Sequence, residues 1–257
     1  MSFTYIASGF AVGLLVGMTG VGGGSLMTPI LTLLFGVQPS VAVGTDLAFA
    51  SLTKTAGTLT HKVRGTVRWD IVRLLCVGAL PAALLATIGL KLFGTLNKEI
   101  GQFIRYSIAV SVMLTVVAIL FRGKMLAWML ADPARQLHGR RLSAATVLAG
   151  AILGVLVTIS SIGAGAIGAT LLVLMYPRLT AAEVAGTDIA YAVPLTAIAA
   201  FGHWWLGSID WALLLALLVG SVPGITLGSW AARAVPDRFL RGLLATTLTG
   251  VAFKLIS

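Results

Sequence analysis

The sequence predicts an all-α integral membrane protein, built as an inverted-topology repeat of two four-segment halves. Three observations support this fold class. The chain is 58% hydrophobic and only 10% charged, whereas soluble domains are about 25% charged. Specific residues recur 142 positions further along the chain. Glycines interrupt long apolar segments at matching places in the two halves, as they do in many membrane transporters.

Apolar segments of membrane length occur several times in the chain. A bilayer core about 30 Å thick requires about 20 apolar residues per helix, and the runs 74–90, 106–121 and 211–232 are of this kind. The first apolar run lacks the preceding basic residues of a cleaved signal peptide and continues into a glycine motif. We therefore expect a multi-pass protein of the bacterial inner membrane, in contact with the lipid bilayer.

The same order of segments is expected in both halves. Each half begins with a glycine-interrupted stretch, which we expect to form a re-entrant hairpin or two short half-helices, because bare backbone within a membrane must be buried in protein. About eight segments result, or ten if both arms of each stretch cross the membrane. The first half (1–121) contains the stretch 3–36 and helices near 45–61, 70–90 and 102–121. A basic cytoplasmic linker (122–142) follows it. The second half (143–257) contains the stretch 143–176 and helices near 180–202, 209–232 and 238–255.

The internal repeat is visible in individual residues. Gly44-Thr45-Asp46 matches Gly186-Thr187-Asp188 at an offset of 142. The same offset relates His61 to His203, Gly65 to Gly207, Trp69 to Trp211, and Gly78 and Pro81 to Gly220 and Pro223. A single offset that serves all these pairs indicates duplication.

Basic residues predict that the two halves have opposite orientations. The loop 62–68 is basic, but its counterpart, the loop 203–210, contains no Lys or Arg. Because cytoplasmic loops are enriched in Lys and Arg, these two loops are expected on opposite faces of the membrane. The net charge of +10 is therefore assigned to topology, and no nucleic-acid partner is expected.

The glycine motif of the first half is the first candidate binding site. Gly22, Gly23, Gly24 and Ser25 disfavour a continuous helix and leave backbone N–H groups unshielded. The helix that starts after them directs the positive end of its dipole to the same place, which favours an anion. The counterpart in the second half contains Ser161, Gly163 and Gly165, and we expect both segments to bind substrate.

The paired Thr-Asp sequences have two interpretations. Thr45 with Asp46, and Thr187 with Asp188, open the expected helices, so each aspartate can be a helix N-cap residue at the favourable end of the dipole. Acidic residues at membrane depth are, however, functional candidates. We expect the two aspartates to carry a coupling proton or to act in gating, and the two threonine hydroxyls to contact substrate.

Lys54 is a sharper functional candidate. It lies far from both ends of its expected helix, and Thr55 and Thr58 lie close to the same face. A lysine at this depth faces a partner or a polar cavity, so we expect it to supply positive charge to an anion, with the two hydroxyls as donors. Snorkelling to the headgroups and pairing with an aspartate are the alternatives.

The remaining candidates are His61 and His203, which end equivalent helices. Either histidine can titrate near neutral pH and contribute to gating, or be a capped residue at the membrane interface. We expect no metal site and no cofactor, because the chain has one cysteine and the inversion separates the histidines. A nucleophile with an oriented base is absent from the sequence pattern, so an enzyme is not expected.

In these features the sequence resembles the sulfite exporter TauE/SafE family of membrane anion permeases, also called the TSUP family. The motifs that carry the resemblance are Thr19-Gly20-Val21-Gly22-Gly23-Gly24 with Pro29, Ser160-Ser161-Ile162-Gly163-Ala164-Gly165-Ala166, and Gly186-Thr187-Asp188. The resemblance covers almost the whole chain. It implies transport of small sulfur-containing anions such as sulfite or organosulfonates.

We therefore expect a secondary transporter of such anions, working by alternating access at a midplane site. The first alternative is a proton- or cation-coupled carrier of another small solute, with Asp46 and Asp188 as the ligand site. The second is a membrane assembly factor that transports nothing.

Overall fold

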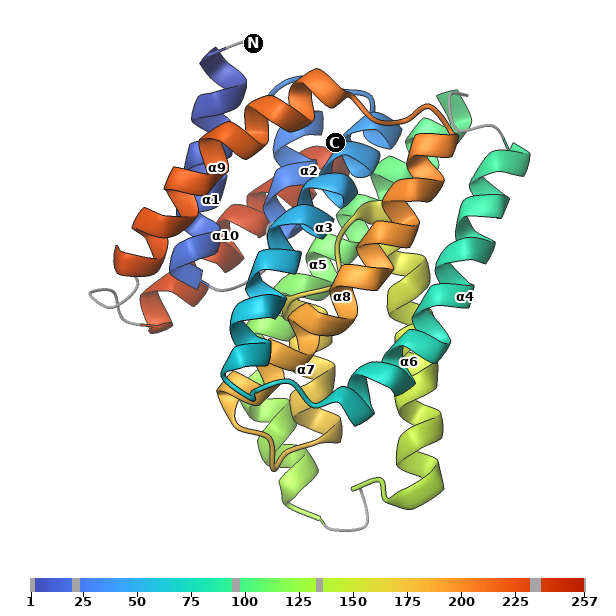
Figure 1. Ribbon diagram of the computed structural model, residues 1–257, viewed down its shortest axis with the longest axis vertical. Coiled ribbons are helices and arrows are strands. Elements are labelled where there is room, and N and C mark those ends of the chain that lie inside the picture. The colour runs from blue at the N-terminus through green and yellow to red at the C-terminus, as the bar shows by residue number, and fades with distance from the viewer. Residues whose placement is uncertain (1–2, 20–23, 94–97, 133–135, 232–236, 257) are drawn as a thin grey trace.

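The computed structural model describes residues 3–19, 24–93, 98–132, 136–231 and 237–256, and within these ranges the regular secondary structure is entirely helical (Figure 1). The helices are α1 (Phe3–Thr19), α2 (Gly24–Leu33), α3 (Pro39–Val63), α4 (Trp69–Phe93), α5 (Lys98–Leu130), α6 (Gly139–Ser160), α7 (Ala166–Met175), α8 (Ala181–Trp205), α9 (Trp211–Ala231) and α10 (Asp237–Ile256).

Five of these helices, α4, α5, α6, α8 and α9, are long and apolar enough to cross a membrane. The expectation of an all-α membrane protein is thereby confirmed. The interrupted stretches each contain a longer helix followed by a helix of 10 residues, α2 or α7. A helix of that length extends about 15 Å, which is half of a bilayer core.

Two boundaries differ from the sequence-based expectation. Helix α5 continues to Leu130, so residues 122–130, expected in the linker, are helical. Helix α3 begins at Pro39 rather than near residue 45, whereas α8 begins at Ala181, close to the expected residue 180. Thr45-Asp46 and Thr187-Asp188 therefore lie inside these helices rather than at their N-caps. The N-cap interpretation of these residues was therefore wrong.

The true starts of these two helices have ordinary local causes. Proline at the first position of α3 loses no hydrogen bond there and has the φ angle that a helix requires. Helix α8 starts with a capping box: the Thr180 hydroxyl accepts from the Glu183 N–H at 3.2 Å, and the Glu183 carboxylate accepts from the Thr180 N–H at 2.9 Å. The sequence Thr-x-x-Glu was a visible signal for this start.

Helices α3 and α8 pack together at the centre of the molecule, with α1 and α9 on one side and α4 and α6 on the other (Figure 1). The segment after α3 contacts the beginning of α8, because the Arg68 N–H donates to the Thr187 hydroxyl at 3.1 Å. The segment after α8 contacts α3 in the same way, because the Asp210 N–H donates to the Thr45 hydroxyl at 3.1 Å. These two helices, which are equivalent in the repeat, therefore run antiparallel.

These hydrogen bonds form a reciprocal pair, since Arg68 and Asp210 are also separated by 142 positions. The glycines beside them repeat the relation: Gly44 lies against the Ser208 carbonyl, and Gly186 against the Thr66 carbonyl. Equivalent positions of the two halves therefore make reciprocal contacts.

Small residues bring the outer helices into close contact. A Cβ atom added to Gly78 of α4 would overlap the Val147 carbonyl of α6, and one added to Gly220 of α9 would overlap the Ile6 carbonyl of α1. Such close approach is a common basis of helix association in membranes, where the surrounding lipid is as apolar as the side chains.

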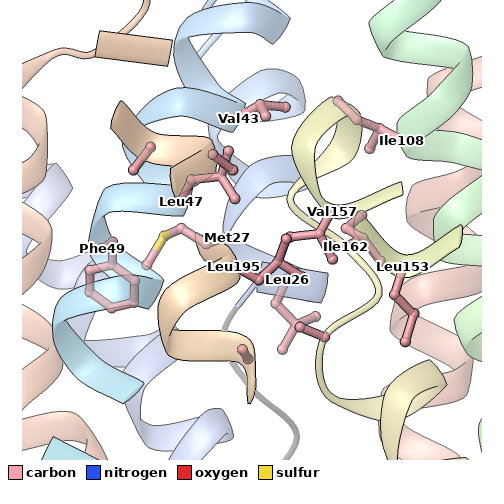
Figure 2. Close-up of a cluster of buried hydrophobic side chains, with 14 of the residues drawn as sticks. Leu26, Met27, Val43, Leu47, Phe49, Ile108, Leu153, Val157, Ile162 and Leu195 are labelled. Atoms are coloured by element: carbon pink, nitrogen blue, oxygen red, sulfur yellow. The ribbon is translucent and has the colours of Figure 1, made fainter. Parts of the chain in front are cut away.

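The core between the halves is apolar. Figure 2 shows side chains of α2 and α3 facing those of α6, α8 and the segment between α6 and α7. They include Leu26, Met27, Leu47, Phe49, Val157, Ile162 and Leu195, all buried. The few charged groups within this core therefore lie in a medium of low polarity, where an unpaired charge is costly.

Candidate functional site

The candidate site is a cluster of buried polar side chains beside the interrupted segment of the second half. Helix α6 ends at Ser160, and α7 begins at Ala166. Between them Ser161, Gly163 and Gly165 have φ angles of 59°, 135° and 132°, a region that favours glycine. The chain thus reverses inside the protein, and the N–H groups at the start of α7 point into the core.

The matching segment of the first half is only partly described. Gly22 and Gly23, both predicted to bind substrate, lie outside the described residues. Gly24 and Ser25 are the first residues of α2, so this helix begins within the glycine motif rather than after it.

Lys54 lies at the centre of the cluster. Its side chain is 8% exposed, and its ammonium group donates to the Ala164 carbonyl at 3.2 Å. The ammonium interacts electrostatically with both Asp188 and Asp46. Snorkelling to the headgroups is therefore excluded. Pairing with an aspartate stays a prediction, because in the described part of the chain neither aspartate forms a direct ion pair with Lys54.

Asp46 is completely buried and belongs to the same helix as Lys54. Its Oδ2 atom accepts from the Thr28 hydroxyl at 2.6 Å, which ties α3 to α2. Its Oδ1 atom has no hydrogen-bond partner in the described part of the chain, and neither has the nearby Ser161 hydroxyl. One buried carboxylate oxygen and one buried hydroxyl thus remain unsatisfied at the same place.

Asp188 belongs to α8, and its carboxylate lies against the N-terminal end of α7. The Gly165 N–H faces its carboxylate, and Gly168 packs so closely against Oδ1 that an added Cβ would overlap that atom. The same Cβ would lie 2.8 Å from the Tyr191 hydroxyl. Neither Asp188 Oδ1 nor the Tyr191 hydroxyl has a hydrogen-bond partner among the residues described, although both are buried.

The threonines predicted to bind substrate differ in position. Thr58 follows Lys54 by one helical turn, and its buried hydroxyl has no partner within the described ranges. Thr55 is exposed, and its hydroxyl donates to the Ser51 carbonyl of its own helix at 2.7 Å. Thr45 and Thr187 are buried, and their hydroxyls hold the connecting segments of the opposite half.

The two histidines lie beside these segments rather than in the charge cluster. His61 Nδ1 is 2.8 Å from the Thr66 hydroxyl. His203 is fully buried, and its Nε2 is 2.9 Å from the Thr158 carbonyl oxygen. In the described part of the chain, three or more His, Cys, Asp or Glu side chains nowhere gather as metal ligands.

Two residues of the cluster, Thr28 and Tyr191, were not predicted from the sequence. Thr28 becomes a partner of Asp46 only through the packing of α2 on α3, so no spacing rule predicts it. Tyr191 was visible in principle, because it follows Asp188 by three positions on one helix. The equivalent of Tyr191 in the first half is Phe49, so only one aspartate has a phenol beside it.

A surface pocket of about 310 Å³ opens at the start of α8. Its lining includes Arg68, Arg178, His138 and Glu183. Asp188 follows Glu183 by five residues on α8, which is about 7.5 Å along the helix axis. A basic pocket therefore lies close to the buried cluster.

Comparison with known proteins gives the family. The family model described as "Sulfite exporter TauE/SafE" matches residues 5–255. Two proteins of Bacillus subtilis (strain 168) are similar: the probable membrane transporter protein YjnA, 36% identical over 100% of both chains, and the probable membrane transporter protein YdhB, 28% identical over 93% of both. A probable membrane transporter protein of Xylella fastidiosa (strain 9a5c) is 29% identical over 87% of this chain and 82% of its own.

No solved structure matches the chain. The family model covers nearly the whole sequence, and the relative from Bacillus subtilis aligns from end to end. The resemblance noted in the sequence is thereby confirmed, and the chain belongs to the sulfite exporter TauE/SafE family.

Proposed function

We propose that the protein is a secondary transporter of small sulfur-containing anions, such as sulfite or organosulfonates, that works by alternating access. The observation that carries the proposal is the buried Lys54 ammonium, which lies beside the reversing segment 161–165 at the core of a membrane protein. A buried lysine is costly unless it has a partner or a function. The sulfur in the substrate comes from the family alone.

Two positive features converge on the proposed substrate position. The first is the Lys54 ammonium. The second is the start of α7, where N–H groups without helical partners and the helix dipole favour negative charge. The Ser161 and Thr58 hydroxyls, both unsatisfied in the described structure, are suitable additional donors to an oxyanion.

We further propose that the two halves are inverted in the membrane. The antiparallel packing of the equivalent helices α3 and α8 supports this arrangement. Inverted repeats with short half-helices at the midplane are common in transporters that alternate between two open states. In this arrangement the Thr187 and Thr45 hydrogen bonds lie near opposite faces, and we assign Thr187 with His61 to one gate and Thr45 with His203 to the other.

Uptake into proteoliposomes tests the function. Vesicles loaded with unlabelled sulfite or a simple sulfonate should accumulate the labelled anion by counterflow. Lys54→Gln should abolish this accumulation, while Lys62→Gln, which alters an exposed lysine on the same helix, should leave it intact. Absence of counterflow with any small anion, or full activity of Lys54→Gln, would refute the proposal.

Cysteine labelling tests the inversion. In a Cys76→Ser background, Lys62→Cys and Trp204→Cys place thiols at exposed, equivalent positions of the two halves. A membrane-impermeant maleimide applied to intact cells should label position 204 and should label position 62 only after permeabilisation. Equal labelling of both positions in intact cells would contradict inversion.

The two aspartates support a second candidate function. Asp46 and Asp188 each have a buried carboxylate oxygen without a partner in the described residues, as expected if the carboxylates bind a cationic ligand. In a carrier of that kind, Asp46→Asn abolishes ligand binding and Lys54→Ala does not. The anion transporter predicts that the Lys54 variant loses binding.

A further inference from the structure

The charges of the cluster present a physical difficulty for an anion site. Lys54, Asp46 and Asp188 are all buried. With both carboxylates ionised, their sum is one negative charge, which repels an anion. Arg122 of α5 also acts on Asp188, but it is partly exposed and so is not one of the three buried charges.

Asp188 also occupies the place that would attract an anion. Its carboxylate faces the Gly165 N–H at the start of α7, and it interacts with the Lys54 ammonium. Both positive features that the proposed function assigns to the substrate are therefore already engaged by a negative group of the protein. A substrate anion must compete with this carboxylate unless the carboxylate becomes neutral.

The surroundings of Asp188 Oδ1 suit a proton. Oδ1 and the Tyr191 hydroxyl lie against the same side of Gly168, and neither has a partner in the described chain. A neutral carboxyl group donates one hydrogen bond, and a phenol oxygen accepts one. The two oxygens do not hydrogen-bond to each other as they stand, and a proton on Oδ1 that turns toward the phenol oxygen would give both atoms a partner. The other titratable group facing Tyr191 is Cys76 of α4, which is neutral as a thiol.

We propose that Asp188 carries one proton for each anion transported, with Tyr191 as acceptor for that proton, so that the substrate is a singly charged oxyanion moving together with H⁺. This inference rests on the proposed function. The proton passes from water on the open side to Asp188 Oδ1. It returns to water on the other side when the anion leaves. No bond other than the O–H bond forms or breaks.

Charge balance explains why one proton suits a monovalent anion. The empty cluster has a net charge of −1. One proton makes it neutral, and a monovalent anion restores −1. The empty and the loaded protein then bury the same charge, so neither state pays an additional electrostatic penalty when it reorients within the membrane. A divalent anion would leave −2 with a single proton.

The first half has no phenol beside its aspartate. Asp46 Oδ2 accepts from the Thr28 hydroxyl at 2.6 Å, so one of its two oxygens already has a donor. Phe49 stands where the second half has Tyr191, so no phenol oxygen is provided there. Asp46 therefore acts as the fixed counter-ion of Lys54, and Asp188 as the group that changes charge.

The test is transport of isethionate, a singly charged sulfonate, in proteoliposomes that contain a pH-sensitive dye. Wild-type protein should show counterflow at equal pH on both sides. An inward isethionate gradient should acidify the lumen by one proton per anion, independently of membrane potential. Asp188→Asn should lose the acidification entirely, whatever its rate of counterflow.

Tyr191→Phe is the sharper variant, because it removes one oxygen and reproduces the residue of the first half. It should lower the pH at which coupled uptake is half-maximal by about one unit, the equivalent of one hydrogen bond. Phe49→Tyr, the matched control, should leave that pH unchanged. An upward shift in Tyr191→Phe would show that the phenol stabilises the ionised carboxylate and would overturn its assigned role.

The wild-type measurement tests the inference even if a variant fails to fold. Counterflow without any proton movement overturns this inference and leaves the proposed function intact. Absence of counterflow overturns both. Acidification that persists in a folded Asp188→Asn protein assigns the proton to another group and also overturns the inference.

Discussion

Removal of the Lys54 ammonium is the most informative single perturbation of this protein. Lys54→Met keeps an apolar stem of similar length and eliminates the cation that faces Asp46 and Asp188. It also eliminates the 3.2 Å hydrogen bond to the Ala164 carbonyl. The variant therefore leaves two buried carboxylates without their common partner.

The expected loss of unfolding free energy follows from protonation of the carboxylates. Taking up a proton at pH 7 costs an aspartate with an ordinary pKa near 3.9 about 4 kcal/mol. Breaking a buried ion pair from one side typically costs about 3–5 kcal/mol, which agrees with this value. Because the proton replaces the missing cation, the deficit should decrease by about 1.4 kcal/mol for each unit by which the pH is lowered.

The free energy of unfolding can be measured by SDS titration in mixed micelles, with fluorescence of the six tryptophans as the signal. Lys54→Met should be destabilised at pH 7 and recover progressively at pH 6 and 5. Adding Asp188→Asn should restore much of the stability at pH 7. Lys62→Met is the matched control. A Lys54→Met protein as stable as this control, or a deficit independent of pH, would refute the assignment of a buried charge cluster.

Three further predictions concern contacts around the cluster. Thr28→Val should cost about 1–3 kcal/mol of unfolding free energy, less at low pH, because a buried carboxylate loses its donor; the same SDS titration measures it. Gly78→Ala should destabilise the α4–α6 pair, since the added Cβ overlaps backbone of α6. In Gly89→Ala, on the same helix, the added Cβ meets no atom within 4 Å, so the free energy of unfolding should rise by up to about 1 kcal/mol. Equal effects of the two variants would contradict the close packing. Thr187→Val and Thr45→Val should each accelerate hydrogen exchange only at the backbone amide that the hydroxyl holds, and exchange at the two amides in the opposite pattern would contradict the reciprocal arrangement.

Several features of the molecule were predictable from sequence because they depend on composition or on local spacing. The membrane class follows from hydropathy, and the duplication follows from one offset that relates Thr45-Asp46 to Thr187-Asp188. Lys54 was predicted to face a partner because a lysine inside an apolar helix has few other arrangements. Its burial beside both aspartates agrees with that argument. The helix after Gly22 and Gly23 was also expected, although those glycines lie outside the described residues.

Predictions from local sequence were wrong where contacts between distant segments determine the position of a residue. Thr45-Asp46 and Thr187-Asp188 were expected to open helices, yet both pairs lie within helices. The glycine before each pair allows a close approach, because a Cβ at Gly44 or Gly186 would meet the backbone of a connecting segment far away in the chain. Thr55 was predicted to contact substrate from its spacing to Lys54, but it is exposed. Spacing along a helix specifies a face, whereas the neighbours of that face are decided by packing.

The sequence by itself therefore determined the kind of protein, its repeat and the existence of a buried cation, because each of these depends on residue type and order. Only the tertiary structure decided which partners the charges have. Thr28 reaches Asp46, and the Asp188 carboxylate lies against Gly168 of α7, because separate helices pack against one another. The two halves are therefore chemically unequal although their sequences repeat, since hydrogen bonds between distant segments depend on positions that no sequence interval specifies.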